Sequence, residues 1–183
     1  DCRSRRHLLQ PPRRDARGNL VAALVASPLQ RTRESSEPLT EIFDIPPVID
    51  ERVIEPTNVF EGRRMKQALA NPLNWRHLRQ PAVPSWGEPY ASIVGRMVDA
   101  MNDAWERVPD GDVVVVSHQL PIWVTHLAIA RQPTRHDPRK RRCALSSVTS
   151  FERRDGDAGA PRWTEVAYAE PASTAGAVDV GAV

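Results

Sequence analysis

Two short segments of the 183-residue sequence end an apolar run with polar side chains. One reads LVAALVASPLQR and carries Ser27 and Arg31; the other reads DVVVVSHQLPIW and carries His118 and Gln119. An arginine on the first turn of a helix favours a phosphate group, because its guanidinium fork adds to the positive end of the helix dipole. A histidine at a strand end can bind a phosphoryl oxygen or carry a proton near neutral pH. These residue types indicate phosphate chemistry.

Each candidate also has an ordinary structural interpretation. Arg31 could lie beside Arg33 on a solvated helix face, and His118 could be a hydrogen-bonded structural histidine. His126 falls inside an apolar helical pattern, so we expect it to pack in the core. Glu55, in DERVIEP, follows a short strand and is a candidate general acid, although most glutamates beside loops are simply exposed.

Two other features leave similar alternatives open. The run RHDPRKRR, from Arg135 to Arg142, could hold an acidic partner or a phosphorylated substrate, but charge blocks usually form solvated loops and we expect one here. Trp75 and Trp86 lie in a long Pro-rich excursion. They could line the site or pin that excursion to the core.

The elements that must position these residues alternate between strand and helix. Strands are predicted at 20–26, from Pro46, at 113–116, near 146–152 and at 162–169, and helices at 28–43, at 88–108 and from His118 to about Arg131. The pattern predicts an α/β fold, a three-layer αβα sandwich with a mostly parallel central sheet. Its valine-rich strand at 113–116 should be buried on both faces. Ligands bind at the carboxyl edge of such sheets, where His118 would lie.

The start of the first helix has a local signature of its own. Ser27 is placed to cap it, with Pro28 at the first helical position and Gln30 completing the spacing of a capping box. The sequence therefore predicts that the Ser27 hydroxyl bonds to the backbone of the helix that carries Arg31.

Length and composition favour one domain. Residues 1–19 are irregular and hold six arginines, 20–170 form the expected domain, and 171–183 read as a flexible tail. A net charge of +2 does not by itself indicate nucleic-acid binding. Cys2 and Cys143 form no disulfide or zinc pattern, and no segment resembles a signal peptide or a membrane span of about 20 residues. A cytoplasmic protein without membrane contact is expected.

Five blocks occur in the order and approximate spacing of the histidine phosphatase superfamily, which has the phosphoglycerate-mutase-like fold. They read ASPLQRTRESSEPL, DERVIEPTNVFEGRR, WGEPYASIVGRM, DVVVVSHQLPIW and CALSSVTSFE. The resemblance spans about Leu20 to Tyr168. It is similar in particular to the phosphatase branch found in high-GC actinobacteria.

The resemblance implies phosphoryl transfer through a phosphohistidine, with no metal or other cofactor. It implies that Arg31 binds the phosphoryl group, that His118 is the second histidine of the site, and that Glu55 protonates the leaving oxygen. Cationic donors would then stabilise charge on the equatorial oxygens while an acid assists departure. The expected ligand is a small phosphorylated substrate or inorganic phosphate, and the oligomeric state is open. Further substrate contacts are expected from Ser27, Gln119 and Glu88.

The family's nucleophilic histidine lies in an Arg-His-Gly motif at the end of the first strand, and this sequence contains no such string. His7 follows an arginine, but Leu8 replaces the glycine and no apolar strand precedes it. His7 also stands only 24 positions before Arg31. We therefore expect the first strand and helix to be absent or altered and catalysis to be impaired. An inactive phosphate-binding protein is one alternative, and a basic nucleic-acid-binding protein is another.

Two further expectations come from these departures. A start misassigned or frameshifted upstream of Leu20 would produce the Arg/Pro-rich beginning, and upstream DNA encoding an Arg-His-Gly segment would support that origin. Gln119 stands where many members have glycine. Its side chain would either crowd the site or add a hydrogen bond to the substrate.

Overall fold

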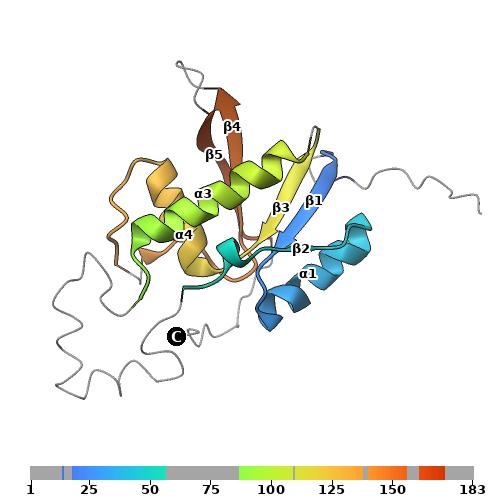
Figure 1. Cartoon of the computed structure of the whole chain (residues 1–183), viewed down its shortest axis with the longest axis horizontal. Helices are drawn as coiled ribbons and strands as arrows, with labels where there is room; N and C mark the ends of the chain where they lie inside the picture. Colours follow the sequence, from blue (N-terminus) through green and yellow to red (C-terminus); the bar gives the residue numbers. More distant parts are fainter. Residues whose placement is uncertain are drawn as a thin grey trace, which may run out of the picture.

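The computed structural model describes residues 14, 18–56, 87–108, 110–137, 140–155 and 161–171. Figure 1 shows the elements of this part of the chain. The expectations for His7, Trp75, Trp86 and the two chain ends lie outside the described residues. The elements are β1 (Val21–Ala26), α1 (Gln30–Phe43), β2 (Val48–Ile49), the 3-10 helix η1 (Glu51–Val53), α3 (Tyr90–Glu106), β3 (Asp112–Val116), α4 (Gln119–Ile129), β4 (Val148–Asp155) and β5 (Pro161–Ala169).

Three parallel strands form the central sheet in the order β2-β1-β3. Leu24 of β1 is in register with Val114 of β3, and Val25 is in register with Val48 of β2. Because the strands run in the same direction, their carboxyl ends meet at one edge. At that edge, the Ser27 N–H donates to the carbonyl oxygen of Val116 at 3.1 Å. The residues that follow β1 and β3 are thereby held side by side.

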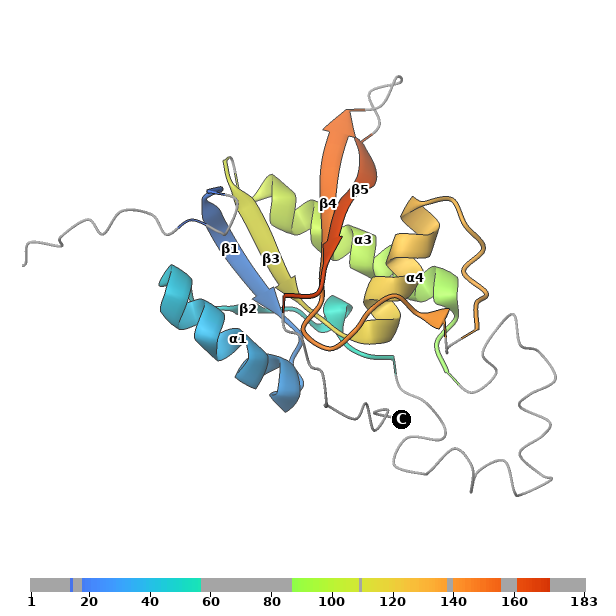
Figure 2. The ribbon, with the colours of Figure 1, turned by 180° about the vertical axis from the view of Figure 1, so that it is seen from behind.

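Helices cover both faces of this sheet, as Figures 1 and 2 show from opposite sides. On one face, Val25 packs in a hydrophobic cluster with Ile93 and Met97 of α3 and Val124 of α4. Leu24 points to the opposite face, because successive strand residues alternate, and it is fully buried there. Helix α1 packs against β1 and β3 on that side. The predicted α/β fold with a parallel sheet is confirmed.

Strand β3 is less buried than its sequence predicts. Val113 to Val116 are all half-buried, whereas a continuous valine run was expected to be buried on both faces. In the part of the chain that the structure describes, β3 has β1 as its single strand neighbour, so its other edge is not covered by a paired strand. Among the described residues, this unpaired edge accounts for the exposure that remains.

Strands β4 and β5 form a separate antiparallel pair, seen beside α3 and α4 in Figure 2. Trp163 of β5 donates its indole N–H to the Asn102 side chain of α3 at 2.9 Å. His126 of α4 bonds to Glu165 of β5, and its ring stacks on Trp123 at 4.8 Å between centroids. His126 was expected in the apolar core. It instead attaches the β4–β5 hairpin to the helical layer.

Helix α1 begins two residues later than predicted. Its N-cap is Leu29, which makes no side-chain cap hydrogen bond. Gln30 donates to Glu34 one turn along the helix and does not complete a capping box. Ser27, the expected cap, is fully buried and its hydroxyl lies 2.8 Å from the ring of His118. The Ser27 hydroxyl still accepts from the backbone N–H of Leu29 at 3.5 Å, so it contacts both the start of the helix and a segment distant in sequence.

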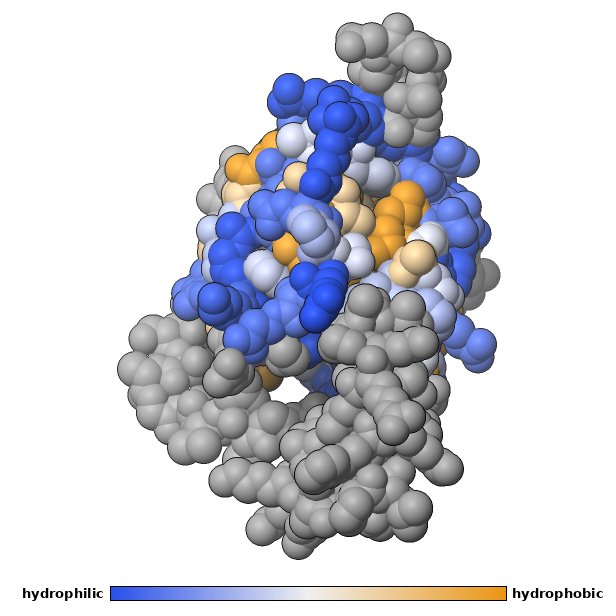
Figure 3. All heavy atoms as spheres, turned by 90° about the vertical axis from the view of Figure 1, so that its left-hand side faces the viewer, coloured by the Kyte–Doolittle hydropathy of each residue, from blue (hydrophilic) through white to orange (hydrophobic). Residues whose placement is uncertain are grey.

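The surface on the side of α3 and α4 is mostly hydrophilic, with separate hydrophobic spots between charged residues (Figure 3). Such isolated apolar residues are normal for a protein surface. None of the helices that the structure describes combines the length and apolar character that a membrane span requires.

Candidate functional site

The buried imidazole of His118 joins the ends of β1 and β3. His118 is the N-cap residue of α4 and is 6% exposed. Its Nδ1 accepts a hydrogen bond from Arg31 Nε at 3.2 Å, and its Nε2 lies 2.8 Å from Ser27 Oγ. Since Arg31 can only donate, the network assigns the ring proton to Nε2, which donates to the Ser27 hydroxyl. The structure therefore brings together three of the residues that the sequence selected.

The first turn of α1, which carries Arg31, is anchored to the end of β1. The Thr32 hydroxyl lies within hydrogen-bond distance of the carbonyl oxygens of Ser27, at 2.9 Å, and Leu29, at 2.7 Å. Thr32 is itself buried. This local bonding holds Arg31 beside His118, 87 positions away in the sequence.

Burial, together with the positive charges of Arg31 and Arg96, lowers the pKa of His118 from 6.5 to about 4. The ring is therefore neutral near pH 7, which agrees with its Nδ1 accepting from Arg31. The carboxylate Oε2 of Glu55 lies 3.7 Å from Nδ1. That contact is not an ion pair while His118 is neutral. A bound anion would favour the protonated ring and raise its pKa.

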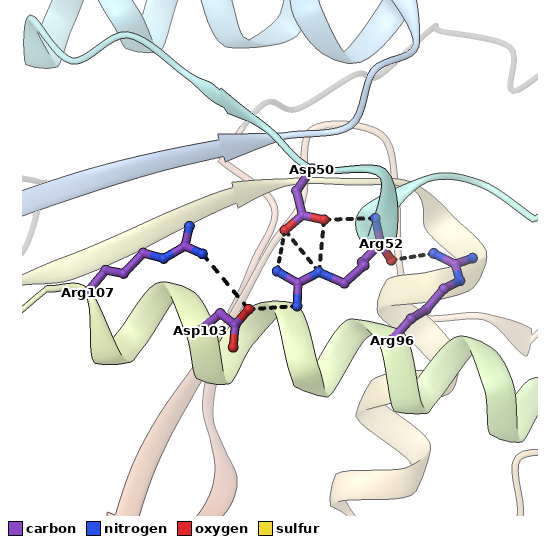
Figure 4. A network of polar contacts seen from close by, with 5 residues as sticks. All are labelled: Asp50, Arg52, Arg96, Asp103 and Arg107. Carbon is purple, nitrogen blue, oxygen red and sulfur yellow. Dashed lines mark hydrogen bonds and ion pairs between the residues drawn. The ribbon is translucent and has the colours of Figure 1, made fainter.

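Glu55 follows η1, which a network of charged residues fixes in place (Figure 4). The Asp50 carboxylate accepts from the Arg52 backbone N–H at 2.8 Å and pairs with its guanidinium, which also reaches Asp103 at 2.8 Å. The hydrogen bonds from Arg52 hold the pKa of Asp50 below its usual value. From α3, Arg96 donates to the Arg52 carbonyl oxygen. Glu55 thus comes from an anchored segment.

Glu88, predicted to contact the substrate, lies against Arg96. Its carboxylate is 2.9 Å from the Arg96 guanidinium and accepts from the Ser92 hydroxyl at 2.7 Å. Burial raises the pKa of Glu88, but the hydrogen bonds from Arg96 and Ser92 outweigh it and leave the value lowered. The structure therefore pairs Glu88 with Arg96. Arg96 in turn bonds to the Arg52 carbonyl oxygen of η1 and helps to lower the pKa of His118.

Gln119, next to His118, is bonded to the basic loop that follows α4. Its Nε2 donates to the Cys143 carbonyl oxygen at 2.8 Å, and its Oε1 accepts from Arg141 Nη1 at 3.4 Å. Arg142 of the same loop pairs with Glu165 of β5. The expectation of a solvated loop is wrong for Arg141, which is half-buried; Arg142 is exposed as expected, although it has a partner distant in sequence.

Arginine side chains give this edge of the sheet its positive charge. The described residues include no group of three or more His, Cys, Asp or Glu side chains that could hold a metal ion. A guanidinium, a buried imidazole and a nearby carboxylate can bind a phosphoryl group and exchange a proton with it. Sequence reasoning missed Arg96, which lies inside a helix and not at a strand end, and it marked Arg141 only as part of the basic run 135–142.

Comparison with known proteins identifies the family of the chain. The family model described as histidine phosphatase superfamily (branch 1) matches residues 13–166. The uncharacterized protein Rv0525 of Mycobacterium tuberculosis H37Rv is 44% identical over 156 residues, which cover 84% of this chain and 75% of that protein. The name of this relative states neither an activity nor a family, so the family comes from the family model.

Solved structures share the fold. Mycobacterial glucosyl-3-phosphoglycerate phosphatase Rv2419c superimposes with a TM-score of 0.65 at 21% identity, covering 80% of this chain and 76% of that chain. Its complex with inorganic phosphate gives a TM-score of 0.65 at 20% identity, with the same coverage. YhfR of Bacillus stearothermophilus gives 0.61 at 25% identity, covering 78% and 71%. The family model, which matches most of the chain, shows that the chain belongs to branch 1 of the histidine phosphatase superfamily.

Proposed function

We propose that this chain binds the phosphoryl group of a small phosphorylated metabolite between Arg31 and His118, as a phosphatase-family protein of the cytoplasm. The observation that carries the proposal is the 3.2 Å hydrogen bond from Arg31 Nε to His118 Nδ1 at the carboxyl edge of the parallel sheet. It places a permanent positive charge and a titratable ring at one point. An anion at that point meets both groups together.

Each residue has a proposed role in this site. Arg31 uses one N–H on His118, and the other four donors of its fork can reach phosphoryl oxygens. When the anion binds, His118 takes up a proton at Nδ1, which ends the bond accepted there from Arg31 and lets Nδ1 donate to the anion. Glu55 lies 3.7 Å from that nitrogen, so its carboxyl group is placed to protonate a leaving oxygen bound there. Ser27 holds the ring from the buried side and orients Nδ1 outward.

We further propose that turnover through a phosphohistidine is impaired in this 183-residue chain. The observation that favours this is the absence of an Arg-His-Gly string from the sequence. The same site without the covalent step is a phosphate-binding protein, which is the second candidate function. Slow or absent hydrolysis of p-nitrophenyl phosphate between pH 5 and 8, with intact phosphate binding, would favour the second candidate.

Phosphate binding to single variants tests the site itself. Millimolar phosphate should raise the unfolding temperature of the wild-type chain by several degrees. The Arg31→Ala variant should bind phosphate at least 10-fold more weakly, because a charge-assisted fork is lost. Arg33→Ala, an exposed neighbour on the same helix, should bind as the wild type does. Equal phosphate affinity in the wild type and in Arg31→Ala would rule out the proposed site.

A further inference from the structure

The basic loop after α4 carries a half-buried arginine next to the proposed phosphoryl site. Arg141 Nη1 donates to the Oε1 atom of Gln119, which directly follows His118 in the sequence. The negative charge of Glu55 is among the influences that raise the pKa of Arg141, although burial outweighs them and lowers it. Glu55 is the same carboxylate that lies 3.7 Å from His118 Nδ1. Arg141 therefore lies on the side of Glu55 and His118.

The guanidinium of Arg141 is held from behind by a neutral ring. Its Nε donates to His136 Nε2 at 2.9 Å, and His136 Nδ1 bonds to the Thr134 carbonyl oxygen at 2.8 Å. A carbonyl only accepts, so Nδ1 carries the ring proton and Nε2 is free to accept from arginine. Burial lowers the pKa of His136, which keeps the ring neutral. The ring of Tyr90 lies 5.6 Å from that of His136.

Arg141 differs from the other partly buried arginines in the groups that receive its hydrogen bonds. Arg52 donates to the carboxylates of Asp50 and Asp103, and Arg96 donates to that of Glu88. Arg141 donates to an imidazole and an amide, both neutral. Holding a positive charge in a half-buried position on neutral acceptors costs free energy, and an anionic ligand would recover it.

We propose that Arg141 forms a second anion-binding position, so that the preferred ligands carry a second anionic group beside the phosphoryl group. The proposal rests on the proposed function, since it assumes that the phosphoryl group lies at Arg31 and His118. Gln119 links the two positions, because it directly follows His118 and its amide oxygen accepts a hydrogen bond from Arg141. Either a carboxylate or a second phosphate fits a guanidinium fork. The site thus selects phosphorylated acids or bisphosphates over phosphate esters of neutral alcohols.

Three non-hydrolysable ligands of similar size separate these possibilities without requiring turnover. Phosphonoacetate presents a carboxylate as the second group, methylenebisphosphonate presents a second phosphonate, and ethylphosphonate presents none. The wild-type chain should bind phosphonoacetate, methylenebisphosphonate or both at least 10-fold more tightly than ethylphosphonate, which has a single anionic group. The member of the pair that binds more tightly identifies the second group.

Substitution of Arg141 should remove this preference and leave phosphate binding intact. In Arg141→Met, the affinity ratio should fall to within about 3-fold, while inorganic phosphate should bind within about 2-fold of its wild-type affinity. Arg141→Lys keeps the charge without the fork and should retain part of the preference. Arg162→Met, an exposed arginine of β5, serves as the matched control and should change neither.

The outcomes distinguish this inference from the proposed function. A preference that is absent from the wild type, or that persists in Arg141→Met, overturns the role of Arg141 even if Arg31→Ala abolishes phosphate binding. If Arg31→Ala binds ethylphosphonate as the wild type does, the proposed phosphoryl site itself is wrong. Thermal unfolding shows whether Arg141→Met folds. If it does not, Arg141→Lys is the deciding variant. A lysine variant that keeps the full wild-type preference for ligands with a second anionic group would contradict a role for the guanidinium fork.

Discussion

The ends of β1 and β3 both deliver a polar residue to the same edge, but the two strands differ in how they are held. β1 has a paired strand on each side, and Leu24, Ala26 and Ser27 are fully buried. β3 is paired with β1 alone among the described residues, and Val113 to Val116 are half-buried. The end of β1 is a fixed frame. The end of β3 carries His118, whose protonation responds to a ligand in the proposed function.

The largest expected effect is a difference in the free energy of unfolding that is lost when a residue of β1 or of β3 is truncated. Leu24 and Val114 are register partners, one fully buried and one half-buried. Leu24→Ala should lower the free energy of unfolding by about 2–5 kcal/mol, and Val114→Ala by about 1 kcal/mol. Urea unfolding of both variants measures the difference. Equal losses would show that β3 is as firmly packed as β1.

The free energy of unfolding should also fall in acid, because His118 at the end of β3 is buried in its neutral form. The folded pKa of His118 is lowered from 6.5 to about 4. Between these values the unfolded chain binds more protons than the folded chain, so stability present above pH 6.5 is lost as the pH falls toward 4. The full contribution is about 3 kcal/mol.

Urea unfolding at a series of pH values, for the wild type and for His118→Gln, measures this contribution. The glutamine variant should lose less stability over that interval. A wild type and variant with parallel pH profiles would remove His118 as the source.

The contact that joins the two ends can be cut from the β1 side. Ser27→Ala leaves the buried Nε2–H of His118 without its acceptor and should lower the free energy of unfolding by about 1–3 kcal/mol. Ser35→Ala, which alters an exposed hydroxyl on α1, should cost less than about 0.5 kcal/mol. A Ser27→Ala protein as stable as the Ser35→Ala control would mean that the serine does not hold the ring.

The smallest expected effect concerns the link between β3 and η1. The Ser117 hydroxyl donates to the Val53 carbonyl oxygen at 2.8 Å, and Ser117→Ala should cost about 1 kcal/mol. Amide hydrogen exchange should accelerate at Ile54, whose N–H bonds within η1, and stay unchanged in α1. Unchanged exchange at Ile54 would show that Asp50, Arg52 and Arg96 hold η1 without Ser117.

The sequence could predict the parallel sheet and the meeting of Arg31 with His118, because both follow apolar strands whose carboxyl ends must converge. It placed the Ser27 hydroxyl at the start of α1, where the Leu29 N–H reaches it, but it could not predict that the same hydroxyl also contacts His118, 91 positions away. Arg141 belonged to a basic run that the sequence marked as a possible holder of a phosphorylated substrate, but nothing singled it out within that run. Its partners His136 and Gln119 become neighbours only when the loop folds back onto α4.

The family resemblance supplied roles that local patterns did not. Glu55 was one of several glutamates beside loops, and its place near His118 depends on the network at η1, to which Asp103 and Arg96 contribute from α3. The same network explains why Glu88 lies with Arg96. Such charge networks join residues with no periodic spacing, so no sequence pattern marks them.

The central claim is that an anion binds against His118 and Arg31, and the titration of the His118 ring tests it most directly. Sulfate keeps its double charge across the pH range, so any change in the ring's pKa comes from binding and not from the ligand's own protons. Imidazole NMR signals followed against pH should give a His118 pKa near 4 in the free protein and a higher pKa with sulfate bound. Arg31→Ala should abolish the sulfate effect. An unchanged His118 pKa at saturating sulfate would contradict the account.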